Sequence, residues 1–409
     1  MTIAKHLFTQ PFLVQNNQLV IGDVPLTRLV NRIGKTPFYA YDRQLIIDRV
    51  TQLRQQMPAD LKIHYALKAN PMPAVVQLMA GLVDGFDVAS TAEMHVALDT
   101  LMHSQHISIA GPSKRRAELS KAIAAGITIN VESANELETI AQLSAQNGMT
   151  ASVAIRINPA FELKTSGMKM GGGAKPFGID EEQLPTVLQR LHALQLDFQG
   201  FHIYSGSQNL KAAALIEAQQ QSIALAMWLL EFCPNGIKKL NIGGGYGIPY
   251  FAGEQPLNTQ QVGDALAIEM TKFKVVQPHA EVIIELGRYL VGEAGVYVSQ
   301  VVDKKISRGQ TYLIVDGGLH HHLAVSGNFG QVIRKNYPVA IGNKMHVEQQ
   351  ETVTIVGCLC TPLDIIADKM CLPVAEVGDF VVVYQSGAYG LTASPNAFLS
   401  QPNAAEVLV

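Results

Sequence analysis

The sequence Ile63-His-Tyr-Ala-Leu-Lys-Ala-Asn-Pro71 places a single lysine, Lys68, directly after a short apolar run that predicts a β-strand. In (β/α)8 barrels, the loops that follow the strands carry the catalytic groups. An amine held against apolar neighbours loses hydration, which lowers its pKa and makes it more nucleophilic toward an aldehyde. Alone, Lys68 could equally be a solvated lysine at the end of a core strand, so its interpretation depends on the rest of the chain.

Seven more runs of this kind follow, separated by helix-like segments. Short apolar or β-branched runs that alternate with amphipathic segments predict parallel βαβ units, and eight of them predict a (β/α)8 barrel of the TIM type. The expected strands are 62–66, 85–89, 107–110, 127–131, 151–157, 198–203, 239–242 and 281–285. The amphipathic segments include 182–194 and 212–232, and two further helices begin at the Ser-x-x-Glu capping boxes of Ser90 and Ser133.

The pattern of apolar residues changes after residue 290. Valine-rich runs follow with no long helical pattern between them, which predicts a C-terminal, mostly-β domain. Two apolar runs on either side of Asn16-Asn17 predict a hairpin that joins this domain. The expected organisation is therefore an N-terminal segment (1–38), a barrel (39–290) and a C-terminal β domain (291–409).

Composition excludes several classes of function. The 409 residues carry a net charge of -3, which gives no basic field for nucleic acid and no cationic face for a membrane. No apolar run approaches the roughly 20 residues that span a bilayer, and the first residues lack the apolar core of a signal peptide. Four cysteines are too few for a disulfide framework and too poorly grouped for a metal site. We expect a cytoplasmic protein without a metal.

Two polar motifs follow the last two expected barrel strands. Asn241-Ile-Gly-Gly-Gly-Tyr-Gly247 follows the seventh, and its glycines allow backbone N–H groups to close on an anion. Glu285-Leu-Gly-Arg288 follows the eighth and supplies a guanidinium suited to phosphate oxygens. These loops commonly form the phosphate site of a barrel. An imine-forming lysine, a phosphate site and an acid that can keep a pyridine nitrogen protonated together indicate pyridoxal phosphate.

With these motifs the chain resembles the fold-type III pyridoxal-phosphate decarboxylases, the group of diaminopimelate, ornithine and arginine decarboxylases. The resemblance covers nearly the whole chain. The motifs that carry it begin with Tyr65-Ala-Leu-Lys-Ala-Asn70, Phe86-Asp-Val-Ala-Ser-x-x-Glu93, Arg156-Ile-Asn-Pro159, Lys175-Pro-Phe-Gly178 and Gly200-Phe-His-x-x-x-Gly-Ser207. They continue with the glycine triplet, Glu285-x-Gly-Arg288, Asp316-Gly-Gly318, Cys360-x-x-x-Asp364 and Gly387-Ala-Tyr-Gly390.

The resemblance implies a role for each matching residue. Lys68 would hold the cofactor as a Schiff base, Glu285 would meet its ring nitrogen, and Cys360 would protonate the product carbon in the site of the neighbouring subunit of a homodimer. The implied cofactor-binding residues are Lys68, Asp87, Glu93, Arg156, Tyr204, Ser207, Gly243, Gly244, Gly245, Glu285, Arg288 and Tyr389. The candidate substrate-binding residues are His202, His320, Thr361 and Asp364.

The departures from the family pattern concern the substrate. Tyr204 stands where relatives have a histidine stacked on the cofactor. Thr361 stands where relatives that act on diamino or basic amino acids have an acid for the distal ammonium. The arginine that binds the far carboxylate of diaminopimelate, near Ala324, is missing, and three histidines from His320 share that loop.

We therefore expect α-decarboxylation of an amino acid with altered specificity. Relatives of this lineage act on amino acids attached to a carrier protein, such as a glutamyl thioester, so a carrier-bound substrate is one interpretation. Three alternatives stay open: a true diaminopimelate decarboxylase of lysine biosynthesis, an amino-acid racemase, and a non-catalytic regulatory homologue. The Cys-x-x-x-Asp motif argues against the racemase, and the intact Lys68, Glu285, Arg288 and Cys360 argue against the regulatory homologue.

Overall fold

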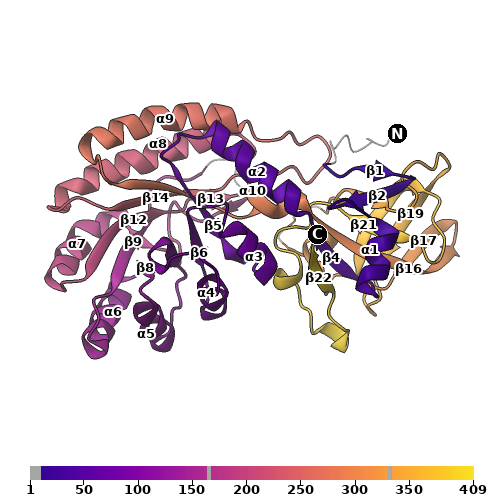
Figure 1. Ribbon diagram of the computed structural model, residues 1–409, viewed down its shortest axis with the longest axis horizontal. Coiled ribbons are helices and arrows are strands. Elements are labelled where there is room, and N and C mark those ends of the chain that lie inside the picture. Colours follow the sequence, from indigo (N-terminus) through magenta and orange to yellow (C-terminus); the bar gives the residue numbers. More distant parts are fainter. Residues whose placement is uncertain (1–10, 164–166, 330, 332–333) are drawn as a thin grey trace. The chain divides into compact units, whose positions relative to one another are not determined.

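The computed structural model describes the chain except for residues 1–10, 164–166, 330 and 332–333 (Figure 1). The described residues form two compact units. The barrel unit consists of Arg49–Ile248 and Pro256–Tyr289. The β unit consists of the described residues up to Asp48, together with Pro249–Gln255 and Leu290–Val409.

Eight parallel strands form the barrel unit. In chain order they are β5 (Lys62–Ala66), β6 (Gly85–Val88), β7 (Ile107–Ile109), β8 (Thr128–Val131), β9 (Ser152–Asn158), β12 (Asp197–Ile203), β14 (Lys239–Gly244) and β15 (Glu281–Leu286). Each strand pairs in parallel with the next, and the ring closes where β15 pairs with β5. The strands are nearly continuously buried, as expected for a parallel sheet covered on both faces. The predicted barrel is confirmed, and the strand ends differ from the expected ones by one or two residues.

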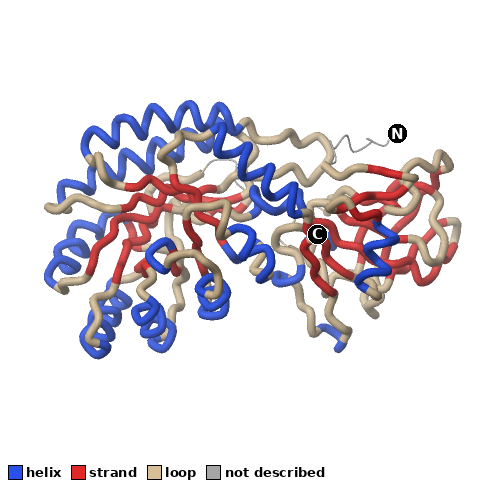
Figure 2. The backbone as a smooth tube through the Cα atoms, in the orientation of Figure 1, coloured by secondary structure: helices blue, strands red, loops and turns tan. Residues whose placement is uncertain are grey.

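Helices lie outside the strands of this unit, as the blue and red segments of Figure 2 show. They are α2 (Arg43–Gln56), α3 (Pro73–Met79), α4 (Thr91–Leu98), α5 (Arg116–Ala125), α6 (Ala134–Asn147), α7 (Leu184–Ala193), α8 (Ala212–Leu229), α9 (Thr259–Val276) and α10 (Arg288–Val291). The side chains of Ser90 and Ser133 cap α4 and α6, as predicted. Such a cap stabilises a helix by about 1 kcal/mol. In the described part of the chain, no helix is long and apolar enough to cross a membrane.

The β unit is built around one long strand, β16 (Gly295–Ser307). The other strands are β4 (Phe38–Tyr41), β17 (Gln310–Val315), β18 (Val339–Ile341), β19 (Gln350–Val356), β20 (Ile365–Pro373), β21 (Phe380–Val383) and β22 (Ala405–Leu408). The first half of β16 pairs with β4 and β21, and its second half pairs with β17. The sheet continues from β17 through β19 to β20. This unit is the predicted mostly-β domain.

The opening hairpin belongs to the β unit. Strands β1 (Val14–Gln15) and β2 (Gln18–Ile21) pair across Asn16 and Asn17, which have φ values of 50° and 63°. Asparagine tolerates this left-handed backbone better than most residues do. Buried side chains of the hairpin pack in one cluster with residues of β16 and β21. The N-terminal segment therefore completes the core of the β unit.

The boundary of the units differs from the expected one. The barrel was expected to begin at residue 39. Strand β4 pairs with β16 and β22, so the backbone hydrogen bonds of β4 belong to the sheet of the β unit. The barrel unit consequently begins at Arg49, and the segment Pro249–Gln255 joins the β unit. The first ten residues of the expected segment 1–38 lie outside the described residues.

Candidate active site

The centre of the site is a buried carboxylate, Glu285, that contacts two basic side chains. Glu285 lies in β15, and Lys68 lies in a single turn of 3-10 helix after β5, the neighbouring strand. Lys68 Nζ lies 3.1 Å from Glu285 Oε1. His202 Nε2, from β12, lies 3.1 Å from Glu285 Oε2. Strand register thus brings together residues up to 217 positions apart in the sequence.

Glu285 is held in its ionised form. Burial alone would raise its pKa, because a dry environment favours the neutral acid. The charge of Lys68 and the hydrogen bond from His202 outweigh burial and hold the pKa of Glu285 well below its ordinary value. Because an ionised carboxylate only accepts hydrogen bonds, His202 Nε2 donates this one. His202 was expected to bind substrate. In the structure His202 is 2 % exposed, and its Nε2 contacts Glu285.

Lys68 combines a buried partner with an accessible amine. Its side chain is 40 % exposed, whereas that of Glu285 is 4 % exposed. The Nζ atom lies 5.3 Å from the centre of the Tyr204 ring, so the tyrosine flanks the amine. The sequence suggested apolar neighbours around the Lys68 amine. In the structure this amine contacts the carboxylate of Glu285.

Glu93, near the start of α4, is a second carboxyl group close to Lys68. Its Oε2 accepts a hydrogen bond from Ala89 N at 2.8 Å. Burial raises the pKa of Glu93, and the hydrogen bond from Ala89 and the charge of Lys68 oppose that rise. Glu93 therefore lies within electrostatic reach of the Lys68 amine.

The glycine triplet forms a crowded backbone turn at the end of β14. Gly243 and Gly245 have φ values of 72° and 81°, which favour glycine. A Cβ atom on Gly244 would lie 2.0 Å from the carbonyl oxygen of Glu285, and one on Gly245 would lie 2.6 Å from that of Gly206. Side chains are excluded from all three positions, because a Cβ on Gly243 would also lie 2.6 Å from a carbonyl oxygen.

Ser207 adds a hydroxyl group that lacks a partner. It lies in β13 (Gly206–Ser207), directly after β12, and its Oγ is buried with no hydrogen bond within the described residues. A buried polar atom without a partner costs about 1–3 kcal/mol, so it indicates a ligand. Arg288 begins α10 immediately after β15. The glycines, Ser207 and Arg288 thus follow neighbouring barrel strands and fit a phosphate group, while Lys68 and Glu285 fit the aldehyde and ring nitrogen of pyridoxal phosphate.

Arg156 is bound by an acid that the sequence analysis missed. Arg156 Nη1 lies 2.8 Å from Oε1 of Glu132, the residue that follows β8, and the guanidinium lies 5.1 Å from the Phe177 ring centre. Glu132 also accepts hydrogen bonds from the backbone of Gly111 and Gly178. Burial would raise the pKa of Glu132, but Arg156 and Lys114 together lower it. The signal in the sequence was an acid directly after a barrel strand.

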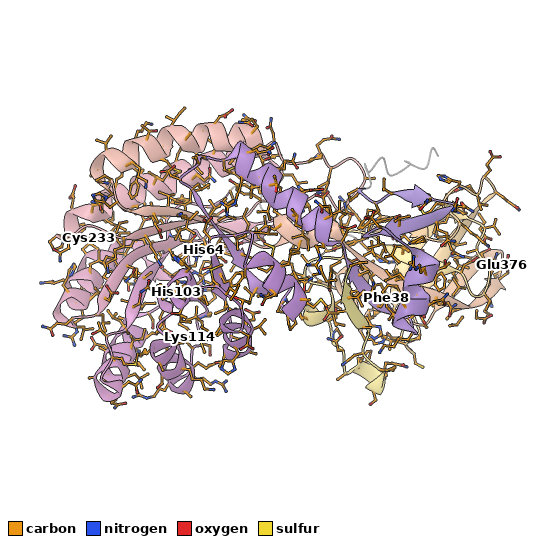
Figure 3. The ribbon with its side chains drawn as sticks, viewed as in Figure 1. Phe38, His64, His103, Lys114, Cys233 and Glu376 are labelled. Atoms are coloured by element: carbon orange, nitrogen blue, oxygen red, sulfur yellow. The ribbon has the colours of Figure 1, made fainter. Side chains whose placement is uncertain are left out.

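Asp87 lies inside the barrel and is already engaged there. It was expected to bind the cofactor. Its Oδ1 instead accepts a hydrogen bond from Ser108, and its Oδ2 lies 3.3 Å from Nδ1 of His64, the residue labelled in Figure 3. These side chains line a small interior cavity of about 30 Å³. Asp87 alternates with the buried Phe86 and Val88 along β6, which explains its inward direction.

Cys360 and Thr361 lie in the β unit, on the loop between β19 and β20. Cys360 is exposed and is not part of a disulfide, and Thr361 is half-buried. A thiol that is accessible in its own unit can serve a site formed with another chain. Within the described residues, no group of three or more His, Cys, Asp or Glu could hold a metal ion.

Asp364 was expected to bind substrate, and the structure shows its carboxylate bound to backbone N–H groups. Its Oδ1 accepts a hydrogen bond from Leu319 N at 2.6 Å, and its Oδ2 accepts one from Leu359 N at 2.9 Å. A side chain on Gly318 or Gly357 would collide with its carboxylate. Asp364 is therefore a brace that joins the histidine loop to the Cys360 loop.

The histidine loop is buried. His320, His321 and His322 are 0 %, 1 % and 1 % exposed, so the loop is not solvated. His322 Nδ1 accepts a hydrogen bond from Val325 N, and its Nε2 lies 3.0 Å from Ser386 Oγ. His320, expected at the substrate, lies against His321, with ring centres 3.7 Å apart and ring planes tilted by 42°. Tyr389, expected at the phosphate, belongs to the β unit and has a φ of 54°.

Comparison with known proteins agrees with this geometry. Residues 43–292 match the family model described as "Pyridoxal-dependent decarboxylase, pyridoxal binding domain", which is more than half of the chain. The chain belongs to the pyridoxal-dependent decarboxylases. Pyridoxal phosphate is therefore its cofactor, and the resemblance to the fold-type III enzymes is confirmed.

Three of the similar decarboxylases are informative. The chain is 37% identical to the L-glutamyl-[BtrI acyl-carrier protein] decarboxylase of Niallia circulans, over 95% of this chain and 92% of that protein. It is 30% identical to the 2-[(L-alanin-3-ylcarbamoyl)methyl]-2-hydroxybutanedioate decarboxylase of Staphylococcus aureus, over 89% of this chain and 92% of that protein. The crystal structure of a diaminopimelate decarboxylase from M. jannaschii with L-lysine has a TM-score of 0.86 and 26% identity, over 97% of this chain and 92% of that one. The chain is thus similar along nearly its whole length to decarboxylases that act on different substrates.

Proposed function

We propose that this pyridoxal-dependent decarboxylase removes the α-carboxylate of an amino acid attached through its side chain to an acyl carrier protein. The observation that carries the proposal is Thr361, which follows Cys360 at a position where the family resemblance implies an acid in enzymes that act on basic amino acids. A threonine hydroxyl cannot balance a distal ammonium, and burial of an unpaired charge is costly.

Asp364, the acid nearest to Thr361 in the sequence, is 2 % exposed and accepts backbone N–H groups on both oxygens. The sequence contains no arginine between Arg308 and Arg334 to bind a far carboxylate. A thioester on a carrier converts the distal carboxylate of an acidic amino acid into a neutral group. Such a substrate needs neither an acid at Thr361 nor an arginine near Ala324. The named activity of the Niallia circulans relative, on a carrier-bound glutamyl group, supports the same class of substrate.

The residues of the barrel unit would divide the work of holding the cofactor. Ser207, Arg288 and the N–H groups of the glycine triplet would bind its phosphate, and Lys68 its aldehyde carbon. With Lys68 at the aldehyde carbon instead of beside the carboxylate, Glu285 would be available to the ring nitrogen. Bound pyridoxal phosphate supplies an electron sink for the electrons of the broken carbon–carbon bond.

The proposal includes a homodimer with shared sites. In this arrangement Cys360 of one subunit gives the proton of its thiol to the α-carbon in the partner's site after CO₂ leaves. The exposure of Cys360 in its own unit and the family resemblance support this role. The brace formed by Asp364 and Leu359 N would hold the loop beside Cys360 in place.

Mass spectrometry tests the reaction and the substrate together. The holoenzyme is incubated with diaminopimelate, lysine, ornithine, arginine and glutamate, and with glutamate as a pantetheine or carrier-protein thioester. We expect loss of CO₂ from the thioesters and not from the free amino acids. Loss of CO₂ from free diaminopimelate alone would contradict the proposal, and exchange of the α-hydrogen with solvent without loss of CO₂ would indicate a racemase.

A further inference from the structure

A groove of about 370 Å³ lies in the β unit beside the loop that carries Cys360 and Thr361. Its volume falls within the roughly 300–1,000 Å³ of small-molecule sites. We call it the arm groove and define it by Lys305, Ser307, Tyr312, Ile314, Thr361 and Asp364, which all line it. Apart from Thr361 and Asp364, none of these residues has a role in the account given above.

Lys305 supplies the positive charge of the arm groove. Asp364, the acid that lines the groove, is 2 % exposed and accepts backbone N–H groups on both oxygens. Within the described residues, no carboxylate pairs with Lys305. Its neighbour Lys304, by contrast, pairs with Glu351 at 2.8 Å and with Glu376 at 3.4 Å. Successive side chains of a strand point to opposite faces, so the two lysines of β16 serve different surroundings.

The rest of the groove offers both apolar surface and hydroxyl groups that can form hydrogen bonds. Ile314 contributes apolar surface, and Ser307 and Tyr312 contribute hydroxyl groups. Tyr312 donates its hydroxyl to Gln310 at 2.9 Å, which leaves its oxygen able to accept a hydrogen bond from a ligand. These walls suit a slender ligand of methylene and amide groups that ends in an anion. They do not suit a basic amino acid, since Lys305 would repel its ammonium.

We propose that the arm groove binds the phosphopantetheine arm of the carrier, with the thioester end toward Thr361 and the phosphate toward Lys305. This assignment rests on the proposed function and names the site that reads its substrate. Thr361 directly follows Cys360 in the chain and lines the groove, so a substrate that reaches Cys360 lies beside the groove. A neutral thioester leaves no unpaired charge at that position.

Two thioesters that differ only in the phosphate test the assignment. The holoenzyme is assayed with glutamyl-S-pantetheine and with glutamyl-S-phosphopantetheine. We expect the wild type to have the lower KM for the phosphorylated substrate. Lys305→Gln should raise that KM about tenfold, the effect of losing roughly 1.4 kcal/mol of binding. It should leave kcat unchanged and leave the KM for glutamyl-S-pantetheine unchanged.

Lys304→Gln is the matched control, because it removes the same charge from the other face of β16. It should leave both KM values unchanged, and calorimetric titration with phosphopantetheine alone should show weaker binding only for Lys305→Gln. An unchanged KM in Lys305→Gln, or an equal effect of Lys304→Gln, would overturn the groove assignment while carrier-bound decarboxylation stood. Failure of the wild type to release CO₂ from either thioester would end the proposed function, and the arm assignment with it.

Discussion

Lys68 Nζ lies 3.1 Å from Oε1 of Glu285, across the adjacent strands β5 and β15. The pair joins an accessible amine to a carboxylate that is almost fully buried. The charge of Lys68 lowers the pKa of Glu285 and so favours its ionised form.

Replacement of Lys68 should abolish the reaction. Lys68→Ala removes the amine, so we expect turnover to fall by at least about 10³-fold, together with loss of the covalently bound cofactor. Release of CO₂ and reduction with borohydride followed by peptide mass spectrometry measure the two effects. Lys68→Arg is the matched control: it keeps a positive charge beside Glu285, yet should be equally inactive. Turnover in either variant near that of the wild type would contradict the role of Lys68.

His202→Asn should change the pH dependence of the reaction. The variant removes a hydrogen bond that lowers the pKa of Glu285, so that pKa should rise. Since Glu285 acts as a carboxylate, the acid limb of kcat/KM should move to higher pH, with several-fold lower activity at acidic pH. His346, which is exposed, provides the control His346→Asn. A variant with the acid limb of the wild type would show that His202 does not act through Glu285.

Cys360→Ala should impair product formation without loss of the cofactor. Mixing this variant with Lys68→Ala tests the shared site, because a mixed dimer contains one site with both residues intact. Equal amounts of the two inactive proteins should regain about a quarter of the wild-type activity through random exchange of subunits. Mixtures that stay inactive although mixed dimers form would place Cys360 outside the partner's site.

Thr361→Asp should supply a carboxylate that pairs with a distal ammonium of the substrate. We expect kcat/KM for diaminopimelate or lysine to rise at least about tenfold and that for the glutamyl thioester to fall, because the new charge favours a basic end. Thr361→Val keeps the size of the residue without the charge and should not help basic substrates. Steady-state kinetics on both substrates decides the matter, and an unaltered preference in Thr361→Asp would remove Thr361 from specificity.

The histidine loop should make the fold sensitive to acid. Burial lowers the pKa of His322 from 6.5 to about 3, so the unfolded chain binds a proton well before the folded chain does. Stability is therefore lost as the pH falls below 6.5. His322→Gln removes this linkage, so the wild type should lose about 2 kcal/mol more unfolding free energy than the variant between about pH 7 and about pH 5.

Urea unfolding at the two pH values measures the difference. The exposed His346→Gln is the control and should keep the pH dependence of the wild type. Parallel losses of stability in His322→Gln and the wild type would show that His322 takes up its proton in the folded state.

The barrel could be predicted because each of its strands is a short apolar run. Several of these runs are followed at once by a polar or glycine-rich motif. Lys68, Glu285 and the glycine triplet could be placed for this reason alone. Glu132 was missed because a single acid after a strand forms no motif, and its partner Arg156 lies 24 positions away. The contacts of Glu285 with His202 Nε2 and of Leu319 N with Asp364 Oδ1 could not be predicted, because these partners lie far apart in the chain. Such pairings exist only once the strands are in register.

The most direct test of carrier-bound decarboxylation is a competition. The holoenzyme receives equal concentrations of a carrier-bound glutamyl thioester labelled with ¹³C at the α-carboxylate and unlabelled diaminopimelate. The isotope ratio of the released CO₂ then gives the ratio of the two kcat/KM values. The account predicts that nearly all of the CO₂ carries the label. Unlabelled CO₂ as the main product would contradict it and identify a decarboxylase of free diamino acids.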